Sequence, residues 1–477
     1  MSERTDYLII GTGAMGLAFA DTLLVEKPDA TITLVDRYTR PGGHWNVAYP
    51  FVTLHQPSSF YGVASRELSK GRIDRMGYNK GLADLATLPE LRDYFDSVMR
   101  DTLLPSGRVT WHPGCDFEGV EGKIGRFTHR LSGETKEVEF GTLVDGTHLN
   151  TSVPKTHTPN FAADPGATLM PLNDLPEVAT PPSGYTVIGG GKTGIDACLW
   201  LLEQGVPSER IRWVISRDGY MLNRLHAQTS AEHYAGAIGN VANMFEAIAQ
   251  STSQADMFDR LVDCGYFLQL DADHRPTMFH APTVSEAELD ALRTIPVVRM
   301  GRVRRIGLHE IELTDGTIPT DPDHIHVDCS ASPLKNIRAK PVFAEDRITL
   351  QTVRAFQPAF SASFIAHIEA SDRSEAEKNA LTGVVPLPDS LDDFVRMQAA
   401  NMMNQAIWGR DPELRAWMAG NRLDGFSKVP EGVTASPAEL AALSKRIRAA
   451  GMPAAMKLAS YLQRGGEGTP IGRDKAE

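Results

Sequence analysis

Two glycine-rich segments have the residue types and spacing of loops that bind phosphate. The first reads Gly11-Thr12-Gly13-Ala14-Met15-Gly16, and the second reads Gly189-Gly190-Gly191-Lys192-Thr193-Gly194. In such a loop the first glycine allows a tight turn, the second lets the backbone approach a pyrophosphate, and the third lets helix and strand pack closely. A helix that starts in the loop directs free N–H groups and a partial positive charge at the phosphates. The pair predicts a protein that holds two dinucleotides at once.

Each loop lies between a predicted strand and a predicted helix, as this chemistry requires. Apolar residues 7–10 precede the first loop, and residues 185–188 precede the second. Residues 17–24 and 195–204 follow the loops, and the second of these segments has apolar residues at helical spacing. The alternative is a chance match, or one loop that is a degenerate copy without a ligand.

The residues after each loop indicate that the two sites bind different dinucleotides. The strand over residues 31–35 ends in Asp36, about 20 residues past the loop, where a carboxylate accepts hydrogen bonds from ribose hydroxyls and repels a 2′-phosphate. The strand over residues 211–215 ends in Ser216 and Arg217, a hydroxyl and a guanidinium that suit a 2′-phosphate. The second site therefore fits NADPH better than NADH. Asp218 is expected to turn away. Arg224 is a weaker candidate for the phosphate, with an ordinary exposed arginine as the alternative.

Composition excludes several other classes of function. The net charge of −12 gives no basic field for nucleic acid, and no apolar run approaches the ~18 residues of a membrane span. A strand within seven residues of the N-terminus leaves no room for a signal peptide, so we expect a cytoplasmic protein. The scattered cysteines form no C-x-x-C pair, which argues against a metal or redox centre; they are Cys115, Cys198, Cys264 and Cys329. The oligomeric state stays open.

The order of the segments predicts an α/β fold with two Rossmann-like dinucleotide-binding domains and a helical C-terminal extension. We expect the first part of the first dinucleotide-binding domain in residues 1–165, and a proline-rich connector that crosses to the next domain in extended form. The NADPH domain is expected in residues 183–332, with a helical insert at about 230–292. Residues 333–370 would return to the first domain. Residues 371–463 would be helical, and 464–477 a disordered tail.

The segment after Asp36 carries a resemblance to a known family. It contains Gly42-Gly43-His44-Trp45, Tyr49-Pro50 and, over residues 54–61, L-H-Q-P-S-S-F-Y. This resembles the G-G-x-W segment of the single-component flavin-containing monooxygenases and their Baeyer–Villiger relatives. Residues 187–196, V-I-G-G-G-K-T-G-I-D, resemble their NADPH-binding loop. Residues 145–147 and 328–331 stand where that family has its alanine-threonine-glycine-type strands. The resemblance covers roughly residues 5–370.

The sequence also departs from the pattern of that family. The fingerprint F-x-G-x-x-x-H is missing, because the segment after Phe161 lacks the histidine. Lys192-Thr193 replaces the usual Asn-Ser of the second loop, and the usual Gly-Asp at the flavin-facing end of the first domain is not found. Gln56 occupies about the place of an active-site asparagine. These differences concern the oxygenation step more than the cofactors.

The loops and the resemblance together assign candidate residues to each cofactor. FAD is expected at Gly11, Gly13, Ala14, Met15, Gly16, Asp36 and Arg37, with Gly43, His44 and Trp45 near the flavin ring. NADPH is expected at Gly189, Gly191, Lys192, Thr193, Gly194, Ser216 and Arg217. The alternatives are a core aromatic for Trp45, a loop residue for His44 and a solvated side chain for Lys192.

Two further residues are candidates near the flavin. Gln56 is the catalytic candidate, since its amide could hydrogen-bond flavin N5 or an oxygen on the adjacent carbon; the alternative is a satisfied buried amide. His55 is expected to be structural. A helix is expected to start at Pro358, and its N-terminus could stabilise negative charge on the reduced ring. The alternative is an ordinary packed helix.

These residues favour an NADPH-dependent flavoprotein monooxygenase that uses FAD and O2 to oxygenate a small molecule at nitrogen, sulfur or a carbonyl. An alternative enzyme is an NADPH-dependent flavin reductase or oxidase that does not oxygenate a substrate. An alternative of another class is a non-catalytic FAD- or NADP-binding redox sensor. No G-x-S-x-G or H-E-x-x-H motif supports a hydrolase or a metalloenzyme.

Overall fold

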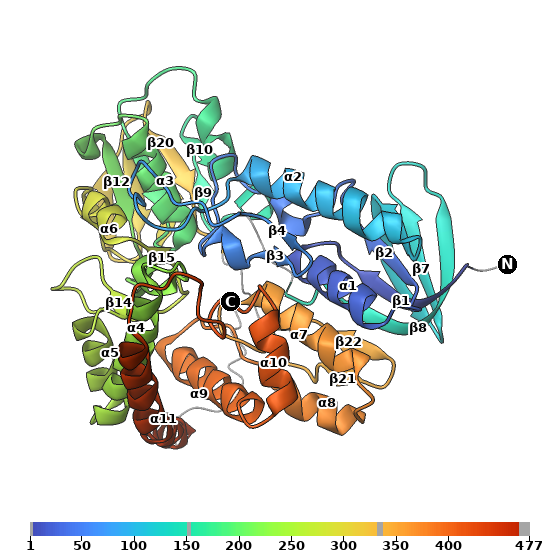
Figure 1. Cartoon of the computed structure of the whole chain (residues 1–477). Helices are drawn as coiled ribbons and strands as arrows, with labels where there is room; N and C mark the ends of the chain where they lie inside the picture. Colours follow the sequence, from blue (N-terminus) through green and yellow to red (C-terminus); the bar gives the residue numbers. More distant parts are fainter. Residues whose placement is uncertain (1–2, 150–153, 332–336, 467–477) are drawn as a thin grey trace.

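The computed structural model describes residues 3–149, 154–331 and 337–466. Figure 1 shows two α/β units, one in blue and cyan beside the N-terminus and one in green and yellow, with a layer of helices below them. No helix in these described ranges has both the length and the apolar character that a membrane crossing requires.

The first unit is built on a mostly parallel sheet. Its described strands are β1 (Glu3–Ile10), β2 (Ile32–Asp36), β5 (Val109–Pro113), β6 (Cys115–Glu121), β7 (Ile124–His129), β8 (Thr135–Asp145), β21 (Phe343–Ala344) and β22 (Arg347–Thr349). The order is β21-β22-β8-β1-β2-β5, and β6 and β7 extend from β8 as an antiparallel meander. β22 pairs in parallel with β8, so the chain after the second unit returns to this sheet.

The second unit repeats this plan with a smaller sheet. Its described strands are β10 (Thr168–Pro171), β11 (Tyr185–Ile188), β12 (Ile211–Val214), β16 (Val297–Val298) and β20 (Ile325–Asp328). They are all parallel, in the order β10-β20-β11-β12-β16. A four-stranded sheet accompanies them: β9 (Ala162–Ala163), β17 (Val303–Ile306), β18 (Glu310–Leu313) and β19 (Gly316–Pro319).

Helices cover both sheets. In the first unit, α1 (Ala14–Glu26) packs against α7 (Pro358–Ala370), and α2 (Leu88–Val98) crosses the outer side (Figure 1). α1 and α7 are buried on nearly all sides, which explains why their sequences are apolar without a polar face. In the second unit, α3 (Lys192–Glu203) packs against α6 (Glu286–Leu292). The short pair β3 (Gly62–Val63) and β4 (Arg66–Glu67) lies beside α1 and α7.

The proline-rich connector differs from its prediction as an extended crossing. It already supplies β10 to the parallel sheet and β9 to the four-stranded sheet of the second unit. Both lie at sheet edges, where proline is tolerated because one side of the strand needs no hydrogen-bond donor. The second sheet therefore begins before residue 183.

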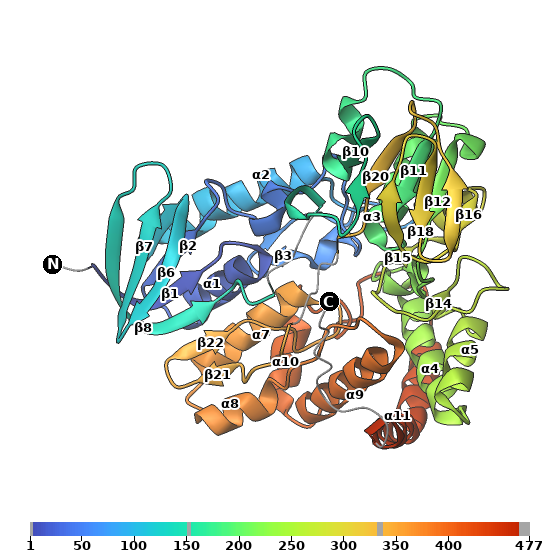
Figure 2. The same ribbon diagram turned by 180° about the vertical axis from the view of Figure 1, so that it is seen from behind.

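The insert and the C-terminal region form one helical layer. α4 (Tyr234–Gln250) and α5 (Gln254–Asp263) come from the insert; α8 (Glu375–Leu381), α9 (Leu391–Trp408), α10 (Pro412–Gly420) and α11 (Pro437–Gly466) follow the first unit. α11 packs along α4 and α9, as Figure 2 also shows. Aromatic side chains fill the junction: Tyr220, Phe258, Phe267, Phe279 and Phe394. The insert also contains a small sheet of β13 (Met221–Asn223), β14 (Phe267–Leu268) and β15 (Thr283–Val284).

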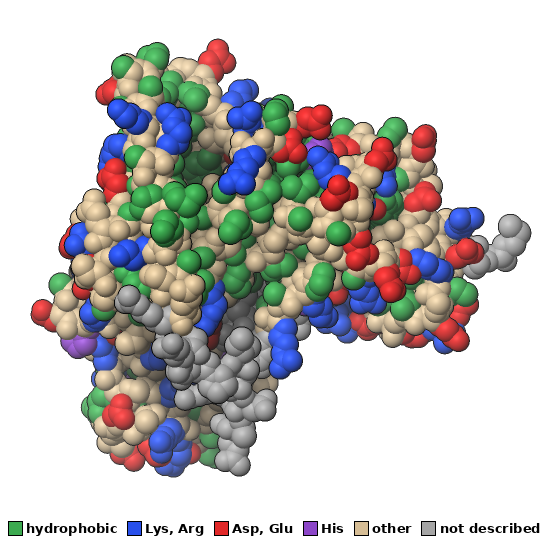
Figure 3. All heavy atoms as spheres, turned by 90° about the horizontal axis from the view of Figure 1, so that it is seen from below, with side chains coloured by type: hydrophobic (Ala, Val, Ile, Leu, Met, Phe, Trp, Pro, Cys, Tyr) green, Lys and Arg blue, Asp and Glu red, His purple; other side chains and the backbone are tan. Residues whose placement is uncertain are grey.

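The last described helix extends into the predicted tail. α11 includes Gly466, so residues 464–466 are helical. Residues 467–477 of the predicted tail lie outside the described residues. Seen from below, acidic, basic and hydrophobic side chains are interspersed over this face (Figure 3).

Candidate cofactor and active site

The first glycine loop has two positions that only glycine can occupy and one that stays open. Gly11 has φ +95°, and a Cβ there would lie 2.9 Å from Thr147 Cγ2. A Cβ on Gly16 would lie 2.0 Å from the Gly11 carbonyl oxygen. Gly13 differs, because the nearest atom to its Cβ position is Gly43 Cα at 3.7 Å. Gly13 is also the N-cap of α1 and has no side chain to cap it, so the first-turn N–H groups of α1 can bind an anion.

Asp36 is buried beside this loop and already oriented. Its Oδ2 accepts hydrogen bonds from the Thr12 N–H at 2.6 Å and the Thr12 hydroxyl at 2.8 Å, and its Oδ1 accepts one from the Tyr38 N–H at 2.8 Å. A carboxylate has about four acceptor positions, so Asp36 keeps capacity for a ribose hydroxyl. Arg37 is exposed, and its Nε lies 3.7 Å from Asp116.

The start of α1 places the two remaining candidates of the first loop. Ala14 is the first residue of the helix and is half-buried. Met15 points into the core with 8% of its side chain exposed, so its contact with a cofactor would be through its backbone N–H.

The G-G-x-W segment rests directly on the first loop. Gly42 donates its N–H to the Thr12 carbonyl at 2.8 Å, and a Cβ on Gly43 would lie 2.9 Å from Gly13 Cα. Trp45 is buried in the core, as its alternative interpretation predicts, and its indole N–H donates to the Tyr61 hydroxyl at 2.9 Å. The G-G-x-W segment, with Gly43, His44 and Trp45, therefore lies directly beside the first glycine loop.

His44 is a neutral group in this segment. Its ring lies 4.7 Å from the Trp45 ring, centroid to centroid. Desolvation by the surrounding atoms lowers the pKa of His44 to about 4, although the side chain is only half-buried. At neutral pH it contributes no positive charge to the site.

Gln56 meets the chain just before α7. Its amide N–H donates to the Phe356 carbonyl. Phe356 has φ +60°, a left-handed conformation that costs a residue with a side chain about 1–2 kcal/mol. Two residues later, Pro358 occupies the first position of α7. The structure thus brings Gln56 and Pro358 to one place, and a hydrogen bond from Gln56 holds the strained turn.

The second glycine loop has the same pattern. Gly189 has φ +132°, and a Cβ there would lie 2.3 Å from the Cys329 carbonyl oxygen. A Cβ on Gly194 would lie 2.0 Å from the Gly189 carbonyl oxygen. No described atom lies within 4 Å of a Cβ on Gly191, which is the N-cap of α3. Thr193 is half-buried in the first turn of that helix.

Lys192 is paired rather than solvated. It forms an ion pair with Asp196, one helical turn later, and each side chain is 13% exposed. Asp196 also accepts a hydrogen bond from the hydroxyl of Tyr49, which belongs to the first unit. Burial, and then the charge of Asp196, raise the pKa of Tyr49, so the phenol stays protonated. The solvated alternative for Lys192 is therefore wrong.

The tip of β12 carries an exposed cation. Ser216 and Arg217 are both exposed, and within the part of the chain that the structure describes Arg217 has no hydrogen bond or ion pair. Asp218 is bound by Arg299 through two hydrogen bonds, of 2.8 and 3.0 Å. Asp218 is thus paired with Arg299, and no hydrogen bond or ion pair joins its side chain to Arg217 among the described residues.

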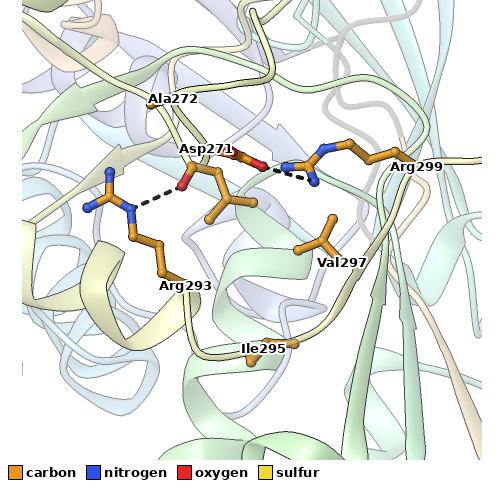
Figure 4. A pocket seen from close by; sticks show the side chains of 7 residues that line it. Asp271, Ala272, Arg293, Ile295, Val297 and Arg299 are labelled. Atoms are coloured by element: carbon orange, nitrogen blue, oxygen red, sulfur yellow. Dashed lines mark hydrogen bonds and ion pairs between the residues drawn. The ribbon is translucent and has the colours of Figure 1, made fainter.

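A cavity of about 450 Å³ lies along β16, and Figure 4 shows its side chains. Arg299 lies 3.5 Å from Asp271 there, and Arg293 donates to the Leu270 carbonyl at 3.0 Å. Arg299 connects this cavity to Asp218 and so to the tip of β12. Neither glycine loop contributes to the lining, which consists of Leu270, Asp271, Ala272, Arg293, Ile295, Val297 and Arg299.

Comparison with known proteins places the chain in a family. The protein Rv2000 of Mycobacterium tuberculosis is 41% identical over 422 residues, which cover 88% of this chain and 78% of Rv2000. Mb2023 of Mycobacterium bovis gives the same values. The chain belongs to the Rv2000 family. Both relatives are named as uncharacterized proteins.

No family model matches the chain. The polycyclic ketone monooxygenase of Thermothelomyces thermophila has a TM-score of 0.52 and 12% sequence identity, over 94% of this chain and 88% of that enzyme. This likeness shows that the chain shares the fold of that enzyme. The predicted fold class, two Rossmann-like units with a helical extension, is confirmed, and so is the resemblance to the flavin-containing monooxygenases.

Arg224 contradicts both of its predictions in this member of the Rv2000 family, as a phosphate ligand and as an exposed arginine. It is 1% exposed and lies between the two units, so it is neither an exposed residue nor available to a 2′-phosphate. It donates to the carbonyls of His55 and Thr283 and pairs with Glu288. Glu288 also belongs to the capping box that starts α6.

Three residues of the site were missed by sequence reasoning. Tyr49 and Asp196 join the units at the second loop, and Phe356 carries the strained turn before α7. Asp196 could have been found as the residue one helical turn after Lys192. Nothing in the spacing pairs Tyr49 with α3 or gives Phe356 its positive φ.

Proposed function

We propose that the protein is an NADPH-dependent flavoprotein monooxygenase that uses FAD and O2 to oxygenate a small molecule. The observation that carries this proposal is a pair of glycine loops with the same backbone geometry, each followed by a strand with a charged residue at its tip. The charge is negative after the first loop and positive after the second. Asp36 follows the first loop and Arg217 follows the second. The fold shared with a ketone monooxygenase supports the same assignment.

The residues of the first loop fit FAD. Gly13 leaves an open approach to the N-terminus of α1, and Asp36 is fixed with acceptor capacity toward a ribose. Gly43 contacts Gly13, so the G-G-x-W segment lies beside the loop. The flavin ring of a bound FAD would extend toward this segment.

The residues of the second loop fit NADPH. Gly191 leaves the N-terminus of α3 open, and the exposed guanidinium of Arg217 can pair with a 2′-phosphate in bidentate fashion. Lys192 would have to leave Asp196 to reach a phosphate, so we assign it to the junction between the units.

Bound flavin would supply the redox chemistry, by accepting hydride from NADPH and then reducing O2. The chain would position it. The N-terminus of α7 would place its partial positive charge beside the ring, and Gln56 keeps a second amide N–H beyond the one bound to Phe356. Buried Trp45 and Tyr61 would exclude water on the side of the first loop.

Oxygenation of a probe under labelled O2 tests the proposal. The probes are an aryl methyl sulfide, a tertiary amine and a cyclic ketone, which cover sulfur, nitrogen and carbonyl oxygenation. We expect one labelled oxygen atom in the product of at least one probe, with NADPH consumed in proportion. Hydrogen peroxide equal to the NADPH consumed with every probe would contradict oxygenation.

A second candidate function is an NADPH-dependent flavin reductase or oxidase. The absence of the F-x-G-x-x-x-H histidine after Phe161 favours it, because the oxygenating relatives carry that residue. The peroxide measurement in the same experiment decides between the two. A protein that neither binds flavin nor oxidises NADPH would instead favour the non-catalytic sensor.

A further inference from the structure

Arg224 joins the second unit to the first through a fully buried guanidinium. Its Nη1 donates to the His55 carbonyl at 2.7 Å, and its Nη2 donates to the Thr283 carbonyl at 2.8 Å. Nη2 also lies 3.0 Å from a carboxylate oxygen of Glu288. His55 belongs to the first unit, and the other two acceptors belong to the second.

Glu288 is held as an anion in this network. Burial alone would raise its pKa, but the charge of Arg224 and hydrogen bonds from Ser285 and Asn79 hold the pKa of Glu288 below its usual range. The Asn79 amide donates to it at 2.9 Å, so a second residue of the first unit is bound here. The pair is therefore ionised, and its geometry is fixed from both units.

The acceptor in the first unit is the carbonyl next to the catalytic candidate. The peptide bond of His55 leads into Gln56, and the Gln56 amide donates to Phe356 in the strained turn before α7. A continuous series of contacts thus runs from Arg224 through His55, Gln56 and Phe356 to the N-terminus of α7. Rotation of the His55 carbonyl would change the direction of the Gln56 side chain.

Other hydrogen bonds cross the same interface besides the one from Arg224 to His55, and one of them comes from Gln228, whose amide also donates to the Arg224 carbonyl at 3.1 Å. The Gln228 side-chain oxygen accepts the Ala83 N–H at 2.7 Å, and the Ser285 hydroxyl donates to the Tyr78 carbonyl at 3.1 Å. Tyr49 binds Asp196 at the second loop. Arg224 is therefore not needed merely to keep the units together, and its distinctive contact is the one with His55.

We propose that Arg224 is a positioning residue for the flavin site: it orients the His55–Gln56 peptide and, through it, the turn before α7. This inference rests on the proposed function, since Gln56 matters only if flavin binds beside it. The nicotinamide-binding unit would in this way set the geometry of the residues around the flavin.

The test replaces the buried pair without leaving a buried charge. In the double variant Arg224→Met with Glu288→Leu, two apolar side chains take the place of the ion pair, which is often neutral for stability. The His55 carbonyl loses its donor. The matched control is Arg108→Met, because Arg108 is a partly buried arginine that also donates to backbone carbonyls, those of Leu24 and Lys27, at 2.8 and 3.1 Å.

The first measurement is backbone hydrogen exchange, which does not depend on flavin. We expect exchange in residues 54–60 and 354–361 to rise about tenfold in the double variant and to stay unchanged in the control. Arg224→Lys, which keeps the charge but lacks the fork of donors, should show a smaller rise in the same segments; it decides the question if the double variant does not fold. Unchanged exchange in both segments would overturn the proposal.

The second measurement reads the flavin site itself. The visible absorbance spectrum of bound flavin should shift in the double variant, and the fraction of NADPH oxidation that ends as peroxide should rise several-fold. The control should match the wild type in both. A wild type without flavin would refute the proposed function, and the exchange result would still decide the role of Arg224. An unshifted spectrum with unchanged peroxide would refute the role alone.

Discussion

The two glycine loops have nearly one geometry but different surroundings. In each, a Cβ on the third glycine would lie 2.0 Å from the carbonyl oxygen of the first, and the N-cap glycine has extended backbone, with ψ −176° at Gly13 and −175° at Gly191. Beyond the loops the charges differ: Asp36 is buried and held by Thr12, whereas Arg217 is exposed and without a partner among the described residues. In our proposal each loop binds a pyrophosphate, and the residue at the next strand tip decides which dinucleotide is bound.

The first turns of helices α1 and α3 also differ. α1 has no charged residue in its first turn, whereas α3 has Lys192, which Asp196 neutralises and Tyr49 ties to the first unit. The second loop is thus connected to its neighbour through polar side chains, and the first through the close backbone contact of Gly13 with Gly43.

The largest expected effect is loss of FAD when the first loop is changed. Gly13→Val places an isopropyl group in the open approach to α1 without backbone strain, since φ at Gly13 is −75°. Overpacking of about 3 kcal/mol would weaken FAD binding about a hundredfold, so we expect the variant to purify largely as apoprotein. The flavin-to-protein absorbance ratio measures this. Full flavin occupancy would break the assignment of FAD to the first loop.

The matched change in the second loop should spare FAD. Gly191→Val occupies the equivalent open position, and we expect the protein to keep its flavin while its affinity for NADPH falls by roughly ten- to a hundredfold. Anaerobic flavin reduction at increasing NADPH concentrations gives that affinity. Purification of this variant without flavin would contradict the assignment of NADPH to the second loop.

The strand tip should set the choice of nicotinamide. Charge-assisted hydrogen bonds to a 2′-phosphate contribute about 1.5–3 kcal/mol, so the wild type should prefer NADPH over NADH by about ten- to a hundredfold. Arg217→Ala should remove most of that preference with little effect on NADH. Arg304→Ala, at another exposed arginine, is the charge-matched control. Equal use of both cofactors by the wild type would place the phosphate elsewhere.

The smallest effect concerns His44 in the G-G-x-W segment. Its folded-state pKa of about 4 lies below the usual value of about 6.5, so below pH 6.5 the unfolded chain binds a proton that the folded protein does not. Stability should therefore fall as the pH drops from 6.5 toward 4, by about 1–2 kcal/mol at pH 5 after allowance for the half-exposed ring. Urea unfolding at pH 7 and pH 5 should show a smaller loss in His44→Gln. An equal loss in both proteins would contradict the desolvation of His44.

Signals that are local in sequence predicted most of the fold. The predicted strand over residues 185–188 matches β11, and the predicted strand over residues 211–215 matches β12, which ends one residue earlier. These elements depend on neighbours within one turn or one strand. The edge strands β9 and β10 were missed because their partners are far along the chain, and the prolines of the connector favoured an extended crossing.

The residues of the candidate site also divide into those that local spacing predicts and those that depend on packing between the two units. The glycine loops, Asp36 and Arg217 followed from spacing, because the strand–turn–helix unit fixes their relation. The burial of Arg224 did not, since only the packing of one unit on the other takes an arginine out of water. The partner of Lys192 lay one turn away, but its tie to Tyr49 again depends on that packing.

The most direct test of the central claim is an anaerobic titration of the purified protein with NADPH, followed by visible absorbance. Two loops that hold FAD and NADPH side by side require a yellow protein whose flavin is bleached by one equivalent of NADPH per flavin. The account predicts that result. A colourless protein, or bound flavin that stays oxidised in excess NADPH, would contradict it.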